Sequence, residues 1–270
     1  MDNFILTLDI LKYGIIVLIL LGLTFSVLSP FVVLSEQSLI ADGLSHVSFT
    51  ALAVGMFFMD EPFYIAIPIV VVSSMLIKFI AQYTKIHSDA AIGIVSSVAF
   101  AIGLIVIKYS NSAIDLESLI SGNLWFRDIN DVLMSGVVFL ITLIFIFSNY
   151  RALISLTFDY DYARFKGVKV NLISYIFAAL VGIFIVVGVR SIGVLLISSL
   201  LIFPVTTANM FSKRFKDLFI YGTIVTLVVI IFGIVLAHMM NVPTGSMIVL
   251  IYFIVFIVIY LIKNLLRRNT

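Results

Sequence analysis

The sequence predicts an all-α polytopic membrane protein, a single domain of residues 1–270 folded as a bundle of eight to nine transmembrane helices. Hydrophobic residues make up 63% of the 270 residues and charged residues 11%, whereas soluble domains carry about 25% charged residues. The apolar runs are about 20 residues long, which suits helices better than the short alternating strands of a membrane barrel. The chain has no cysteine, so disulfides and thiolate metal sites are excluded.

Nine apolar segments are candidates for the spans, and merging or demoting one of them would give eight. The first segment has no short apolar core followed by a small-residue cleavage site, so we expect it to be retained rather than removed as a signal peptide. In chain order the segments are Leu11–Val33, Ser38–Met59, Phe63–Ala81, Ala90–Lys108, Val132–Ser148, Val170–Val189, Ile192–Phe211, Leu218–Met240 and Ser246–Lys263.

The basic residues predict how the bundle is oriented. With nine spans, most Lys and Arg residues fall on one side of the membrane, and only Lys12, Lys108, Arg127 and Arg190 fall on the other. Cytoplasmic loops are enriched in Lys and Arg. We therefore expect an outside N-terminus and a cytoplasmic C-terminus.

The second segment carries two groups that hydrocarbon disfavours, Asp42 and His46. A charged side chain near the centre of a spanning helix costs about 3 kcal/mol, so such residues usually face a cavity or a partner. Their spacing of four residues puts both on one helical face, with Ser45 beside His46. Either the pair lines a path or gate for an ion, or it hydrogen-bonds internally or to a neighbouring helix and holds the bundle together.

Two connections are predicted to contain short helices. On the outer side, residues 115–123 are amphipathic, and Glu117 there is a weaker candidate for attracting a metal ion. On the cytoplasmic side, Phe158, Tyr162 and Phe165 recur at helical spacing, and Gly167 lies where a helix would stop. An exposed helix at about residues 158–167 would be available to contact another protein.

His238, near the outer end of the eighth segment, is another weak metal candidate.

Several motifs resemble the permease subunits of metal ATP-binding-cassette importers, which carry zinc or manganese. Gln37-Ser38-Leu39 followed by Asp42-Gly43-Leu44-Ser45-His46-Val47-Ser48 is similar to the Asp-x-x-x-His signature of that family. The segment from Ala163 to Val168 resembles its ATPase-docking loop. Arg190 to Gly193, with Leu195-Leu196 and Pro204, and Pro243-x-Gly245 match two further family motifs.

The resemblance implies a homodimer in the bacterial cytoplasmic membrane, served by a cytoplasmic ATPase dimer and an extracellular metal-binding lipoprotein. The transported ion would be a divalent metal, zinc ahead of manganese from the context of the motif, with no covalently bound cofactor and no nucleic-acid partner. The chain has no G-x-x-x-x-G-K-[ST] motif, so it is not an enzyme and ATP hydrolysis would occur in the partner. The implied metal path or gate comprises Asp42, His46, Ser45, Glu117 and His238, and the implied coupling residues are Phe158, Asp161, Ala163, Arg164 and Gly167.

Two other classes of protein are alternatives to this interpretation. A proton-coupled secondary transporter could use Asp42 and His46 as its relay, but such proteins usually show paired repeats, and there is no second Asp-x-x-x-His segment. An intramembrane metalloenzyme is disfavoured because the chain lacks H-E-x-x-H and its three histidines lie far apart.

Overall fold

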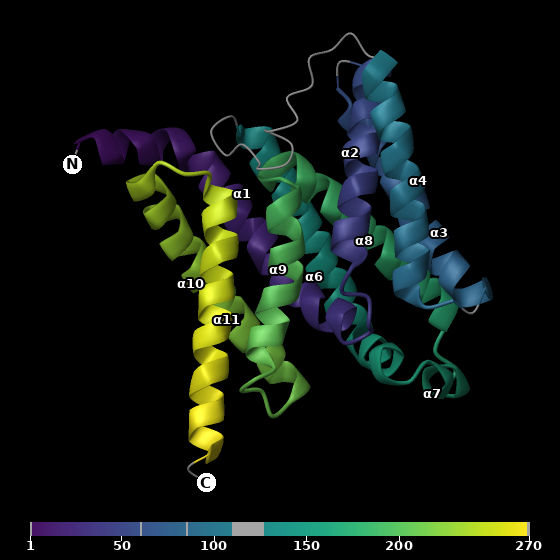
Figure 1. Cartoon of the computed structure of the whole chain (residues 1–270). Helices are drawn as coiled ribbons and strands as arrows, with labels where there is room; N and C mark the ends of the chain where they lie inside the picture. The colour runs from purple at the N-terminus through teal and green to yellow at the C-terminus, as the bar shows by residue number, and fades with distance from the viewer. Residues whose placement is uncertain (1, 60, 85, 110–126, 269–270) are drawn as a thin grey trace.

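The computed structural model describes residues 2–59, 61–84, 86–109 and 127–268, with side chains from residue 11 to residue 265. Within these ranges the regular elements are all helices (Figure 1). They are α1 (Asp2–Val33), α2 (Ile40–Phe58), α3 (Phe63–Thr84), α4 (Ser88–Tyr109), α6 (Ile129–Phe158), α7 (Tyr160–Phe165), α8 (Val170–Ile192), α9 (Val194–Ala208), α10 (Phe215–Met240) and α11 (Thr244–Arg268). The helix predicted at residues 115–123 lies outside the described residues.

The helical membrane bundle is confirmed. Among the described residues, eight helices are long and apolar enough to cross a membrane, and the apolar helix α9 is shorter, at 15 residues. At 1.5 Å per residue α9 spans about 22 Å, but it packs among α1, α10 and α11, and most of its side chains are buried. The start of α1 and the end of α11 lie toward opposite ends of the bundle (Figure 1), an arrangement that fits an odd number of passes with α9 counted among them.

Most predicted boundaries differ from the helix ends by a few residues, and three of the differences have a clear local reason. The fifth span was expected to end at Ser148, but α6 continues to Phe158 through a bend at Asn149 (φ −112°, ψ 16°). There the Asn149 side-chain amide donates to the Phe145 carbonyl at 3.0 Å, a side-chain insertion of the kind that kinks helices. The second span begins at Ile40 rather than Ser38, after a turn in which Glu36 adopts a left-handed φ of 57°.

The third boundary concerns α9, which was expected to start at Ile192. Instead α8 runs to Ile192, and Gly193 alone separates it from α9. Gly193 has φ 85° and ψ 162°, a backbone region that is essentially restricted to glycine. A single residue therefore makes the turn between the two helices.

Close packing of α2 against α4 depends on two glycines. A Cβ on Gly43 would collide with the Ile92 side chain, and one on Gly103 would collide with Thr50. The Thr50 hydroxyl also donates to the Ala99 carbonyl of α4 at 2.7 Å. Small residues and interhelical hydrogen bonds are the usual means of joining helices in a bilayer, where lipid is as apolar as the side chains. These contacts therefore make α2 and α4 one packed unit.

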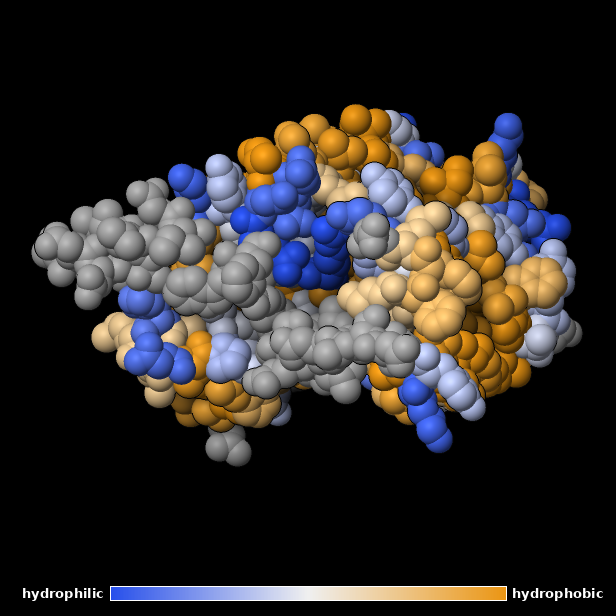
Figure 2. Space-filling model, turned by 90° about the horizontal axis from the view of Figure 1, so that it is seen from above, coloured by the Kyte–Doolittle hydropathy of each residue, from blue (hydrophilic) through white to orange (hydrophobic). Residues whose placement is uncertain are grey.

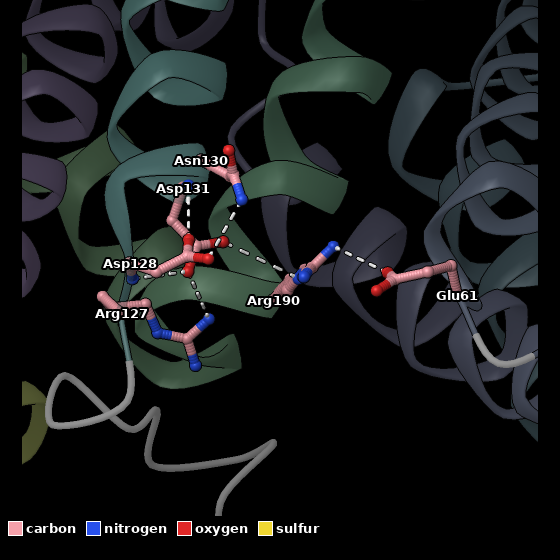
Figure 3. A network of polar contacts seen from close by, with 6 residues as sticks. All are labelled: Glu61, Arg127, Asp128, Asn130, Asp131 and Arg190. Atoms are coloured by element: carbon pink, nitrogen blue, oxygen red, sulfur yellow. Dashed lines mark hydrogen bonds and ion pairs between the residues drawn. The ribbon is translucent and has the colours of Figure 1, made fainter.

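The turn between α8 and α9 lies at the end of the bundle opposite α7 (Figure 1). There an ion-pair network joins separate elements (Figure 3). Arg190, at the end of α8, lies between Glu61 of the α2–α3 turn and Asp131 of α6, with N···O distances of 3.9 Å to each. Arg127 reaches the other oxygen of Asp131 at 3.6 Å. Viewed from above, hydrophilic residues gather near the middle of the molecule with hydrophobic surface around them (Figure 2).

The same network begins helix α6. The Asp128 carboxylate accepts from the Asp131 N–H at 3.0 Å, and the Asp131 carboxylate accepts from the Asp128 N–H at 3.3 Å, which is a reciprocal capping box. The hydrogen bond from the Asp131 N–H lowers the pKa of the Asp128 carboxyl. Asp131 therefore both caps α6 and neutralises two guanidinium groups.

We predict that Asp131→Ala lowers the free energy of unfolding by about 3 kcal/mol, because removing one partner of a buried ion pair leaves the other charge uncompensated. The Asp131 side chain is only 9% exposed. Glu61 is 65% exposed, so Glu61→Gln should cost less than about 1 kcal/mol, as surface ion pairs do. Chemical denaturation in detergent checks both changes, and equal losses for the two variants would contradict the central position given to Asp131.

Candidate metal path

Helix α2 is the most buried of the eight long helices, yet its two ionisable side chains face outward. The Asp42 side chain is 59% exposed and that of His46 is 40% exposed. Their neighbours Ala41, Leu44 and Val47 are buried in the core. The hydrophobic residues thus anchor α2 inside the bundle and leave one polar strip on its surface.

The pair is not locked by hydrogen bonds. His46 Nε2 lies 3.9 Å from Asp42 Oδ2, which exceeds hydrogen-bonding distance. The imidazole packs edge to face against Phe100 of α4, with a centroid separation of 5.1 Å. Within the described part of the chain, neither side chain makes any other hydrogen bond or ion pair. Both groups therefore keep their lone pairs available, which disfavours a purely structural role.

Ser45 lies apart from this strip. It is fully buried, and its hydroxyl donates to the Asp42 backbone carbonyl at 2.7 Å. Its oxygen is thus engaged within the helix, although a contribution to ion binding stays a prediction.

One chain does not supply a complete metal site. In the described residues, no three side chains of His, Asp or Glu lie close enough together to hold an ion. Protein sites for divalent ions usually employ three or more ligands. Asp42 and His46 alone therefore do not make a complete metal site within the described part of the chain.

The structure does not place the remaining metal candidates near Asp42 and His46. His238 lies in the last turn of α10, which packs against α1, α9 and α11, whereas α2 packs chiefly against α3, α4, α8 and α9. Glu117 lies outside the described residues.

The predicted coupling segment forms the short helix α7. Phe158 is not part of it, because it ends α6; this corrects the expected boundary. The Asp159 carboxylate caps α7 by accepting from the Tyr162 N–H at 2.8 Å. Ala163 is fully buried, whereas Asp161 and Arg164 are exposed.

Gly167 ends this helix as its position in the sequence predicts. The Val168 N–H donates to the Ala163 carbonyl and the Gly167 N–H to the Arg164 carbonyl, the pair of bonds that defines a Schellman motif. Gly167 has φ 78°, in the left-handed region that favours glycine. The helix is thus capped at both ends while it presents Phe165, 90% exposed, to the surroundings.

Sequence reasoning missed the partners of Arg190. It marked Arg190 as part of a motif, but Glu61, Arg127 and Asp131 belong to connections that are distant in the chain. The sequence indicates only that these four charged residues lie at the predicted outer ends of spans. It does not indicate which of them form ion pairs with one another.

Comparisons with known proteins agree with this architecture. A family model described as the ABC 3 transport family matches residues 7–263. The manganese import system permease protein ScaB of Streptococcus gordonii is 30% identical over 253 residues, covering 93% of this chain and 91% of ScaB. The manganese transport system membrane protein MntC of Listeria monocytogenes is 26% identical over 252 residues, covering 93% of this chain and 90% of MntC.

A solved structure shares the fold over nearly the whole chain. It is that of PsaBC from Streptococcus pneumoniae in complex with Fab, with a TM-score of 0.83, 27% identity, and coverage of 96% of this chain and 95% of the other. Because the family model spans residues 7–263, the chain belongs to the ABC 3 transport family as a multi-pass permease of the cell membrane.

Proposed function

We propose that this chain is the permease of an ATP-driven manganese importer, and that two copies enclose a path lined by Asp42 and His46. The observation that carries the proposal is the exposure of both side chains on an otherwise buried helix. Asp42 lies in the first turn of α2 and His46 one turn further on, and ionisable groups on a membrane-spanning helix usually face a partner or a water-filled path. A second copy of the chain would provide both.

A two-fold symmetric contact would complete the metal site. Each copy would contribute the same strip, as an isologous interface requires, giving two carboxylates and two imidazoles. An importer must also release its ion, so ligands shared between two movable copies suit it better than a closed site within one chain.

Manganese is favoured over zinc by the relatives. The context of the Asp-x-x-x-His motif favours zinc, but curated relatives that match over most of the chain are named for manganese transport. Carboxylate and imidazole accept either ion, and ligand type does not separate them. The assignment of manganese therefore rests on the relatives.

We assign ATP hydrolysis to a separate cytoplasmic ATPase dimer that contacts α7. The basic loops favour the cytoplasmic side for this end of the bundle, and Phe165 and Tyr162 offer an exposed aromatic surface. Only Asp159 separates α7 from the long helix α6. A displacement of α7 by the ATPase would therefore pass to α6 as a rigid-body movement.

The opposite end, which carries the ion-pair network, would receive the metal from the extracellular lipoprotein. Glu117 is proposed as an attractor for the ion on that side. His238 is left out of the proposed path because its helix does not pack against α2 to any extent.

Asp42→Asn and His46→Gln should each reduce manganese uptake at least about tenfold, since loss of even an outer-shell partner of a metal typically costs that much. The measurement is radiolabelled manganese uptake into proteoliposomes that contain the permease and its ATPase, supplied with metal-loaded lipoprotein, with ATP inside. Normal uptake by both variants would make the pair structural.

Asp89→Asn and His87→Gln are matched controls, because both residues are exposed at the start of α4 and near the same end as Asp42. Both control variants should transport normally. Uptake of zinc in place of manganese would overturn the choice of metal, and uptake driven by a proton gradient without ATP would overturn the ATP-driven mechanism.

Phe165→Ala should weaken association with the ATPase about tenfold or more, as truncating an aromatic interface anchor usually does. Phe211→Ala removes another exposed aromatic side chain from the same end of the bundle and should leave association unchanged. Gly167→Pro should abolish association, because proline requires φ near −65° and Gly167 has φ 78°. Copurification with the ATPase is the measurement, and unchanged binding by Phe165→Ala and Gly167→Pro would refute the docking role of α7.

A further inference from the structure

A cavity of about 480 Å³ lies within the protomer, between the α1–α2 turn, α3, the end of α6, the start of α7, and α8. This volume falls within the range of small-molecule sites, about 300–1,000 Å³. Neither Asp42 nor His46 lines it. The cavity is therefore separate from the proposed metal path, although it lies beside the helix proposed to contact the ATPase.

The cavity wall has an amphipathic character. Ile77, Leu156 and Phe177 give it an apolar part, and Thr157, Tyr160 and Ser174 provide hydroxyl groups. Such a wall suits a ligand with a polar head attached to apolar groups. The Thr157 hydroxyl already donates to the Leu153 carbonyl at 2.9 Å, so the hydroxyls make the wall polar without depending on a ligand.

Lys78 supplies the cavity with a positive charge at an unusual depth. It lies six residues before the end of α3 at Thr84, which is about 9 Å along the helix axis. Helix α3 is about 33 Å long against a hydrocarbon core of about 30 Å, so the Cα of Lys78 lies inside the hydrocarbon boundary. A charge at this depth normally has an anionic or polar partner.

No carboxylate provides that partner within the described residues. The Lys78 ammonium instead lies over the ring of Tyr160, 5.5 Å from its centroid. Tyr160 is itself fixed, because its hydroxyl donates to Asn171 Oδ1 at 2.7 Å, and Gln82 Nε2 donates to the same oxygen at 3.2 Å. The Lys78 ammonium thus lies against a Tyr160 ring that hydrogen bonds hold in place, and its own N–H donors have no acceptor among the described residues.

We propose that this cavity binds the phosphate headgroup of an anionic phospholipid from the leaflet at the α7 end, with Lys78 paired to the phosphate. A soluble phosphate compound shares this chemistry, but the depth of Lys78 and the apolar wall favour a lipid. Glu36, an exposed residue that also lines the cavity, opposes an anion and limits its affinity. The bound headgroup would contact both the α1–α2 turn and the start of α7.

Native mass spectrometry of the full-length chain tests the proposal, with phosphatidylglycerol or phosphatidylcholine added to the detergent. We expect phosphatidylglycerol to be retained in preference to phosphatidylcholine and to raise the melting temperature. Lys78→Gln should weaken retention about tenfold, the effect of losing one charge-assisted hydrogen bond. Glu36→Gln should strengthen it.

Ala81→Leu gives an independent test, because Ala81 lines the cavity and a larger side chain would fill it while Lys78 is kept. Lys216→Gln removes the same charge from an exposed position at the same end of the bundle and should retain the lipid normally. Unchanged retention by Ala81→Leu overturns the site even if Lys78→Gln fails to fold. Equal retention of the two lipids, or an equal rise in melting temperature with inorganic phosphate alone, overturns the assignment to an anionic lipid.

Discussion

A charged side chain inside a bilayer requires a partner or an aqueous space, and this constraint accounts for the arrangement of the polar groups in this protein. Asp42 and His46 leave the packed core of α2 and face outward. Lys78 faces a cavity, and Asp131 lies between two guanidinium groups. The apolar residues hold the helices together, so the positions of the few ionisable groups are where we propose contacts with ions, lipid headgroups or other chains.

Helix α2 connects these environments. The turn before it lines the cavity beside α7, and the turn after it carries Glu61, which pairs with Arg190. Between the two ends, Gly43 brings α2 into tight contact with α4, where there is no room for an added methyl group. Helices α2 and α4 would therefore move together, and a displacement at either end of α2 would change the surroundings of Asp42 and His46.

Hydropathy and charge predicted the helical bundle and the separate polar strip of α2, because both follow from the cost of exposing polar groups to hydrocarbon. The extension of α6 to Phe158 was missed because the sequence becomes polar after Ser148, while the helix continues outside the apolar segment. The network of Glu61, Arg127, Asp131 and Arg190 joins residues that are distant in sequence, and pairing of this kind depends on how the helices pack. Ser45 was grouped with His46 by proximity in sequence, but helical geometry turns it into the core.

The proposed sharing of Asp42 and His46 between two copies bears directly on how an importer could release its cargo. Ligands within one rigid chain would keep their spacing throughout the cycle, and the ion would stay bound. If the ligands belong to two copies, the number that reach the ion depends on how the copies are placed relative to each other. A rigid-body displacement that begins at α7 and passes through α6 would change that placement, so the affinity of the path could be altered without any change in the chemistry of Asp42 or His46.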